Sequence, residues 1–139
     1  MAQEYKKPLP VIDADYKPYW DAAKRHELVQ YRCQICGDFS PIHYPITGCP
    51  KHGRSKMEWT KVSGKGNVYT FVVFRMLFDP AFKDEIPYNV AIIELAEGSL
   101  LMSNIVQCKN EDIKVGMPVE VVFEDVSEEV SLPKFKPAP

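Results

Sequence analysis

The chain has 139 residues, 45% of them hydrophobic, which predicts one or two small globular units. No apolar run reaches the ~18 residues that span a bilayer, and the polar, proline-containing start lacks the pattern of a secretory signal. We therefore expect a cytoplasmic protein without a membrane segment. The net charge is −2, and the strong Lys/Arg cluster that would favour binding to a phosphate backbone is missing.

The N-terminal segment predicts a loose arm followed by a short helix. An aspartate, Asp13 or Asp15, can cap this helix, and Pro18 lies in its first turn. Tyr19 and Trp20 follow at helical spacing. A helix this short is not stable alone, so we expect the two aromatic residues to pack against the rest of the chain.

The most informative motif is a pair of short turns that carry Cys33, Cys36, Cys49 and His52, with the spacing C-x2-C-x12-C-x2-H. Three thiols and one imidazole in two tight turns are the ligand set of a tetrahedral Zn²⁺ site. Four protein ligands close the coordination shell, so the zinc is expected to be structural rather than catalytic. His43 is the alternative fourth ligand, although His52 occupies the position of the second cysteine in a C-P-x-C turn.

A redox-active C-x-x-C pair is the main alternative to the zinc site. Such a pair is typical of a βαβ unit in which a long helix starts at the motif. Here a proline-broken segment, residues 38–45, follows instead, and it disfavours a helix. The remaining cysteine, Cys108, lies in an alternating apolar stretch and is interpreted as a small core residue rather than a nucleophile.

The second half of the chain predicts short strands without a long helix between them. The segment 63–67 is glycine-rich and is interpreted as a domain junction and turn, because it lacks the G-K-[ST] ending of a phosphate loop. A long loop with aromatic residues, 77–87, interrupts the strands. The expected strands of this half are 68–74, 88–95, 100–106, 119–124 and a short last one at 130–132.

The predicted fold class is mainly β, with an N-terminal helical segment, a rubredoxin-like zinc ribbon and a five-stranded OB-fold β-barrel. A closed barrel removes the unpaired edges of such apolar strands. We expect the arm and helix over residues 1–30, the zinc ribbon over 31–62, the barrel over 63–132, and a C-terminal tail, disordered or laid along the surface, over 133–139.

In this order the parts resemble a known family, the zinc-ribbon/OB-fold proteins associated with acyl-CoA metabolism and long catalogued as a domain of unknown function. The resemblance covers nearly the whole chain from Pro18 onward. It rests on Pro18-Tyr19-Trp20, Arg32-Cys33-x-x-Cys36-Gly37, Cys49-Pro50, Trp59 with Val62-Ser63-Gly64-x-Gly66-x-Val68-Tyr69-x-Phe71, Pro87-Tyr88, Gly116-Met117-Pro118-Val119 and Val122-Phe123-Glu124-Asp125.

The resemblance implies a non-catalytic accessory or scaffold protein. Members of this family look like partners of thiolase-type enzymes, including acetoacetyl-CoA thiolase and hydroxymethylglutaryl-CoA (HMG-CoA) synthase in archaea, which they hold together while helping to accommodate the CoA-linked intermediate. The family often has a fourth cysteine where this chain has His52. Imidazole is also a good zinc ligand, so the departure is compatible with a metal site.

An acyl-CoA site needs cations for the phosphates and an apolar slot for the pantetheine arm. Arg75 follows an apolar strand and precedes the aromatic loop, so it is the first candidate cation, and Lys65 near the junction is the second. Phe78, Phe82 and Tyr88 are the candidates to line the slot.

Two other function classes compete with this interpretation. Zinc ribbons and OB barrels also bind single-stranded nucleic acids, and Tyr69, Phe71 and Phe74 could stack on bases. However, the chain from Lys61 to its end holds eight basic and twelve acidic residues, a net charge of −4, which disfavours a phosphate-binding groove. An enzyme using Cys108 or a zinc-bound water is the third possibility, and the closed metal shell disfavours it.

Overall fold

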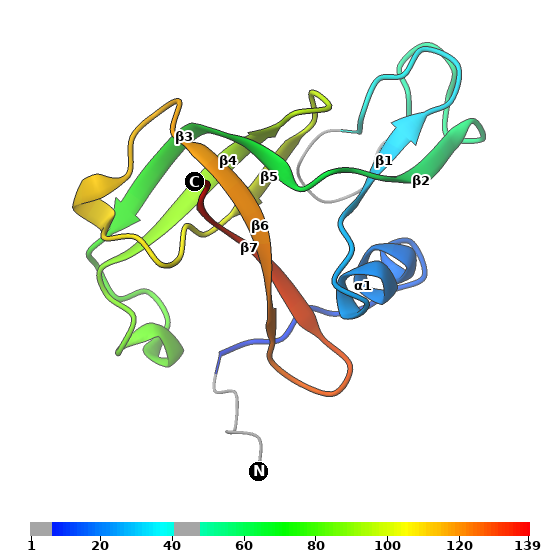
Figure 1. The fold of residues 1–139 in the computed structure, drawn as a ribbon. Coiled ribbons are helices and arrows are strands. Elements are labelled where there is room, and N and C mark those ends of the chain that lie inside the picture. Colours follow the sequence, from blue (N-terminus) through cyan, green and yellow to red (C-terminus); the bar gives the residue numbers. More distant parts are fainter. Residues whose placement is uncertain (1–6, 41–47) are drawn as a thin grey trace.

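The computed structural model describes residues 7–40 and 48–139. Two antiparallel sheets dominate it, a two-stranded ribbon and a five-stranded curled sheet, and one helix lies beside them (Figure 1). The mainly β fold class with one N-terminal helix is therefore confirmed. In the described part of the chain, no helix is long and apolar enough to cross a membrane.

The helix α1 spans Lys17–Lys24 and has a proline in its first turn, as predicted. Tyr16 occupies the N-cap position, and the Asp13 carboxylate accepts a hydrogen bond from the Tyr16 backbone N–H at 3.0 Å. Asp15 does not cap the helix but pairs with Arg54 at 2.5 Å. This ion pair links the start of the helix to the second metal-binding turn.

The ribbon consists of β1 (Val29–Cys33) and β2 (Met57–Lys61), which pair with Tyr31 opposite Trp59. The Trp59 ring lies 5.0 Å from the ring of Tyr31 and 5.9 Å from that of Tyr19 on α1. Tyr19 also packs against the barrel core, as expected from the shortness of its helix. Aromatic contacts thus join the helix, the ribbon and the barrel.

The structure describes the segment after the first metal-binding turn only as far as Ser40. Phe39 forms an isolated antiparallel bridge with Arg32 and packs against the barrel core. Residues 41–47, which include the alternative ligand His43, lie outside the described residues.

The five-stranded sheet has the order β5-β4-β3-β6-β7 with antiparallel neighbours. Its strands are β3 (Lys65–Phe74), β4 (Tyr88–Leu95), β5 (Leu100–Ser103), β6 (Pro118–Asp125) and β7 (Ser131–Pro137). Two single-turn 3-10 helices, η1 (Pro80–Phe82) and η2 (Asn110–Asp112), lie in the loops. The curled five-stranded architecture is that of an OB fold, as predicted.

The sheet curls so that its first and last strands meet. Ile105, just beyond β5, forms a parallel bridge with Phe135 on β7. The backbone N–H of Phe135 donates to the Asn104 carbonyl at 3.0 Å, and the N–H of Val106 donates to the Phe135 carbonyl at 2.7 Å. These bonds cover part of the two outer edges, which would otherwise expose unpaired backbone groups.

The prediction that residues 133–139 form a C-terminal tail, disordered or laid along the surface, is wrong. Residues 131–137 form β7, which pairs with β6 along its whole length, and the Phe135 side chain is fully buried. Pro133 and Pro137 made this segment resemble a tail. Both are tolerated because β7 is an edge strand of the sheet, where a missing backbone N–H costs little.

The glycine-rich junction also differs in detail from its prediction. Gly64 lies in the connection between β2 and β3 with φ of +79°, a conformation that favours glycine. Gly66, however, already belongs to β3, where a Cβ atom would collide with the backbone of Glu94 on β4. The segment is therefore both a junction and the start of a strand.

Candidate functional site

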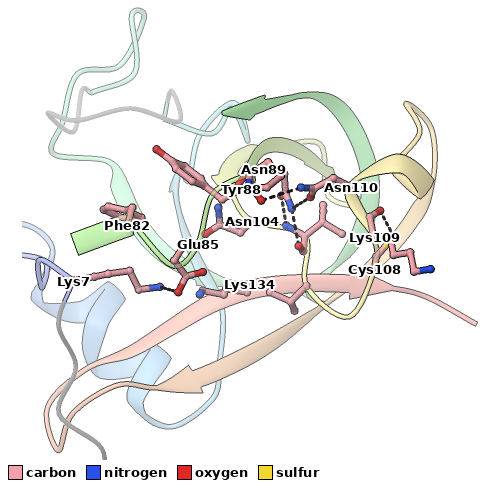
Figure 2. A pocket seen from close by; sticks show the side chains of 13 residues that line it. Lys7, Phe82, Glu85, Tyr88, Asn89, Asn104, Cys108, Lys109, Asn110 and Lys134 are labelled. Atoms are coloured by element: carbon pink, nitrogen blue, oxygen red, sulfur yellow. Dashed lines mark hydrogen bonds and ion pairs between the residues drawn. The ribbon is translucent and has the colours of Figure 1, made fainter. Parts of the chain in front are cut away.

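A pocket of about 350 Å³ opens between β4, β7 and the segment that follows β5 (Figure 2). Its lining combines aromatic, amide and cationic side chains with one thiol. The lining residues are Lys7, Phe82, Glu85, Pro87, Tyr88, Asn89, Asn104, Ile105, Val106, Cys108, Lys109, Asn110 and Lys134. This mixture is typical of a site that binds a polar small molecule by a few placed groups.

Three asparagines form the polar floor of the pocket. The buried Asn89 side chain donates to the Ile105 carbonyl at 2.9 Å and to the Asn110 side-chain oxygen at 3.0 Å, and it accepts from the Ile105 N–H at 2.7 Å. Asn104 donates to the Asn89 carbonyl at 2.5 Å. Because these amides bind each other and the backbone, they hold the floor rigid.

Cationic side chains surround the pocket. Lys7 pairs with Glu85 at 3.2 Å, and Lys134 pairs with Glu124 at 2.5 Å, and both lysine side chains are mostly buried. Lys109 is exposed and forms no ion pair with any residue that the structure describes. Figure 2 shows that the Lys109 side chain extends outward from the rim of the pocket.

The aromatic wall of the pocket contains two of the predicted slot residues. The rings of Phe82 and Tyr88 lie 5.3 Å apart, and both line the pocket. Tyr88 stacks on its other side against Phe74 at 5.2 Å. Phe78, the third predicted slot residue, lies edge-on to Phe74 at 6.2 Å, is 71% exposed and does not line this pocket.

The two predicted cations lie elsewhere. Arg75 is exposed just beyond the end of β3, and Lys65 is exposed at the start of the same strand, opposite Glu120 on β6. Neither lines this pocket. Sequence reasoning instead missed Lys7, Lys109 and Lys134, whose proximity depends on the chain topology. The one local signal was Asn89, a polar residue at an inward position of an apolar strand.

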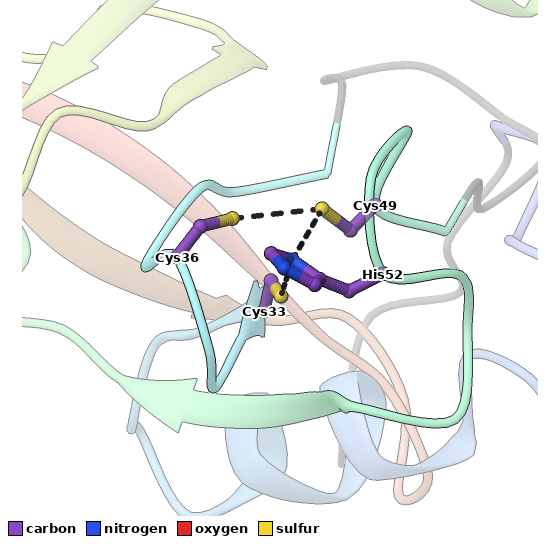
Figure 3. Close-up of side chains that lie close together, drawn as sticks. All are labelled: Cys33, Cys36, Cys49 and His52. Carbon is purple, nitrogen blue, oxygen red and sulfur yellow. Dashed lines mark hydrogen bonds between the residues drawn. The ribbon is translucent and has the colours of Figure 1, made fainter.

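The four predicted metal ligands do come together at the tip of the ribbon (Figure 3). Their ligand atoms all lie within 4.8 Å of one another. The Cys36 and Cys49 sulfurs are 3.5 Å apart, and His52 Nδ1 lies 3.6 Å from Cys33 Sγ and 3.5 Å from Cys49 Sγ. Tetrahedral ligands about 2.0–2.3 Å from one ion are themselves ~3.5 Å apart, so this cluster can hold a metal ion.

Local backbone bonds shape both metal-binding turns. The Gly37 N–H donates to the Cys33 carbonyl at 2.9 Å, and the Gly53 N–H donates to the Cys49 carbonyl at 2.8 Å. Both glycines have positive φ, +80° and +70°, so each turn reverses directly after its ligand pair. The spacing in the sequence thus becomes two loops that aim their ligands at one point.

The thiols of this cluster differ in acidity. The backbone N–H of Cys36 lowers the pKa of Cys33 to about 6, because it stabilises the thiolate. A backbone N–H of Asp38 acts in the same direction on Cys36, but burial and the nearby Cys49 and Cys33 sulfurs raise the pKa of Cys36 to about 11. Crowded sulfurs cannot all ionise without a cation among them, which is consistent with a metal-binding cluster.

Cys108 has the character of a partly buried core thiol. It packs against the barrel core and also lines the pocket. Burial raises the pKa of its thiol, and the thiol lies 3.4 Å from the Lys109 carbonyl. A raised pKa reduces the thiolate fraction at neutral pH, so these features do not favour a nucleophile.

The aromatic residues of the nucleic-acid hypothesis are only partly available. Phe71 packs against the barrel core and Phe74 stacks on Tyr88. Tyr69 is about half exposed. A base-stacking platform needs several free aromatic faces in a row, and these three residues do not offer one.

Comparison with known proteins identifies the family. The C-terminal OB-fold domain described for ChsH2 matches residues 59–124. A DUF35 domain-containing scaffold protein of Methanocaldococcus jannaschii is 41% identical over 108 residues, which cover 76% of this chain and 74% of that protein. The chain belongs to the DUF35 family.

Two further likenesses are to a longer protein and to one chain of an aldolase structure. A probable enoyl-CoA hydratase alpha subunit of Thermomonospora curvata is 36% identical over 132 residues, which are 95% of this chain but only 40% of that subunit. The solved structure of the Ltp2-ChsH2(DUF35) aldolase contains a similar chain, with a TM-score of 0.79 and 35% identity. The match covers 94% of this chain and 100% of that one.

Proposed function

We propose that this DUF35 protein is a non-catalytic accessory subunit, or scaffold, that associates with a thiolase-type enzyme such as a thiolase or an HMG-CoA synthase-like protein. The observation that carries the proposal is the likeness to a whole chain of the Ltp2-ChsH2(DUF35) aldolase structure. The scaffold relative from M. jannaschii, similar over three quarters of its own length, supports the same role.

The pocket supports a role in holding acyl-CoA. Phe82 and Tyr88 offer an aromatic wall for the adenine or pantetheine portion. Lys109 at the rim, which has no ion pair among the described residues, offers a cation for a phosphate. Lys7 and Lys134 lie beside it, each paired with a carboxylate, Glu85 and Glu124 respectively. The predicted contacts of Arg75, Lys65 and Phe78 would lie outside this pocket and stay predictions.

We propose Zn²⁺ as the ion of the ribbon, held by Cys33, Cys36, Cys49 and His52. Three sulfurs and one imidazole nitrogen at tetrahedral spacing suit this ion. The ion would cross-link two turns that bury few other residues, namely Met57 and the partly buried Tyr31. Its role is structural, because four protein ligands leave no position for a substrate.

Among the described residues, the contact of Asp125 with a histidine and a serine is not that of a catalytic triad, which supports a non-catalytic role. Within the described residues, Asp125 accepts hydrogen bonds from both His26 and Ser131. In a catalytic triad the histidine lies between the acid and the hydroxyl, so this trio cannot activate Ser131. We also propose a cytoplasmic location, because three of the four cysteines are the proposed metal ligands and none is paired in a disulfide.

Co-purification tests the proposed association. The tagged full chain would be isolated from its native source at low salt, and bound proteins would be identified by mass spectrometry. We expect a thiolase-type enzyme in stoichiometric amount. Recovery of nucleic acid, or of no enzyme above the untagged control, would contradict the proposal.

Calorimetry with acetyl-CoA tests the pocket, using the chain alone and the chain with its enzyme. We expect Lys109→Ala to weaken binding about tenfold, since a charge-assisted phosphate contact is worth on the order of 1.5 kcal/mol. Lys65→Ala is the matched control, because it removes an equally exposed lysine away from this pocket. Equal losses in both variants would argue against binding in the pocket.

A further inference from the structure

The outer surface of three barrel strands is unusually apolar. Two cross-strand pairs on this surface are aliphatic: Val72 lies opposite Val90, and Ile92 lies opposite Met102. The polar residues among them are Thr70, opposite Ile92 on its other side, and Glu94, opposite Leu100. Val72 and Met102 are each 53% exposed, whereas the next residue along β4, Ala91, points inward and is fully buried. An antiparallel sheet with one face in water normally carries polar residues on that face, so this pattern needs another explanation.

The loop after β3 extends the same surface. Met76, Leu77 and Phe78 are 66%, 45% and 71% exposed, and the Phe78 ring packs edge-on against Phe74 at the end of the strand. We call the combined surface the apolar face; its members are Val72, Phe74, Met76, Leu77, Phe78, Val90, Ile92, Leu100 and Met102. Contiguous exposed apolar patches of this kind mark interaction sites.

The size of the apolar face disfavours a stable dimer held by this face alone. Three strands about 4.8 Å apart and about 20 Å long cover only on the order of 300 Å², whereas a stable interface buries about 800 Å² per partner. Arg75 lies at one end and Glu94 at the other, both exposed and without an ion pair among the described residues. A complementary partner would present an acidic group, an apolar strip and a basic group in that order. A second copy turned about a two-fold axis would also present this order, so the charges alone do not distinguish the two occupants.

The apolar face also shares a wall with the pocket. The Tyr88 ring stacks on Phe74 of the apolar face at 5.2 Å and on Phe82 of the pocket at 5.3 Å. A protein docked on this face would therefore lie directly beside a ligand held in the pocket. This adjacency favours an occupant that acts on the pocket ligand over an unrelated protein.

We infer that the apolar face is the surface through which this chain docks onto its acyl-CoA enzyme. The inference rests on the proposed function for the identity of the partner, and it adds the location of the contact. Docking there would bury Val72, Met102 and Phe78 and would place the pocket mouth at the rim of the interface. Central apolar and aromatic side chains of this kind carry most of the binding energy of an interface.

The test uses the thiolase-type enzyme recovered by co-purification, produced separately and purified, with binding followed by biolayer interferometry. Val72→Glu and Met102→Glu each place a charge on the apolar face, and we expect each to weaken binding at least tenfold. Val115→Glu is the matched control, because Val115 is 67% exposed in a turn outside the apolar face. Thermal melts of all three variants would show that each remains folded.

The outcomes separate the inference from the proposed function. Tight binding of all variants would overturn the docking surface while leaving the accessory role intact. If the wild-type chain itself fails to bind the enzyme, both are overturned. If the wild-type chain sediments alone as a dimer and Val72→Glu dissociates that dimer, then a second copy of the chain covers the apolar face. This result would contradict docking of the enzyme on that face.

Discussion

Replacing Phe135 by alanine should destabilise the barrel more than most other single substitutions. Phe135 is fully buried in β7, lies opposite Val121 on β6, and bridges to Ile105 where the curled sheet meets itself. Truncating a buried phenylalanine removes its transfer free energy and leaves a cavity, at a cost of about 3–5 kcal/mol. For a chain of this size that loss lowers Tm on the order of 10–15 °C.

Thermal unfolding followed by circular dichroism would measure the change, with Phe78→Ala as the control. Phe78 is 71% exposed, so its truncation should cost less than ~0.5 kcal/mol. If Phe135→Ala lowered Tm no more than Phe78→Ala does, then β7 would not be part of the stable barrel. The segment would instead behave as the loose tail that its prolines had indicated.

Further predictions concern the metal cluster and one carboxylate. Cys49→Ser should abolish stoichiometric zinc binding measured by plasma mass spectrometry, and His52→Ala should weaken it at least tenfold; full retention in His52→Ala would exclude His52 as a ligand. Zinc affinity, measured by competition with a chromophoric chelator, should fall as the pH is lowered through the neutral range, because protons compete for the Cys36 thiolate, whose pKa is raised to about 11. It should fall more steeply below about pH 6, where protons also compete for the Cys33 thiolate. Hydrogen bonds from Ser131 and His26 lower the pKa of Asp125 in the folded protein. The ionised Asp125 therefore stabilises the fold at pH values above the ordinary pKa of an aspartate, and this stabilisation is lost as the pH falls through the lowered pKa of the folded state. Ser131→Ala should therefore raise the Asp125 pKa in an NMR titration, and an unchanged value would contradict the assignment.

The metal cluster could be predicted because its information is local in the sequence. Cys33 and Cys36 share one turn, and Cys49 and His52 share the other, so short-range spacing fixes both ligand pairs. The strands could be predicted for a similar reason, since β-branched and aromatic runs are strong local signals.

The pocket could not be predicted in the same way. Lys7 and Lys134 lie near opposite ends of the chain and meet only because β7 closes the barrel. Proline content suggested that this strand was a tail, and the cations that it brings to the pocket were therefore missed. Arg75 and Lys65 were predicted to contact the ligand because they lie close to apolar runs in the sequence. Nearness to such a run does not determine the direction in which a side chain points.

The apolar face was hidden by the composition of β3. Its run from Val68 to Phe74 is apolar on both faces, so the alternation that normally separates core from surface positions is absent. Only the pairing with β4 shows that Val72 points outward while Phe71 packs against the core. Such a pattern is typical of a strand buried on both sides, which agrees with the docking inferred for the apolar face.

The most direct test of the account measures the turnover of acyl-CoA substrates by the purified partner enzyme with and without this chain. We predict no turnover by the chain alone, and an enzyme activity that rises with added chain until one equivalent is bound. Turnover by the chain alone, or an enzyme indifferent to its presence, would contradict an accessory role.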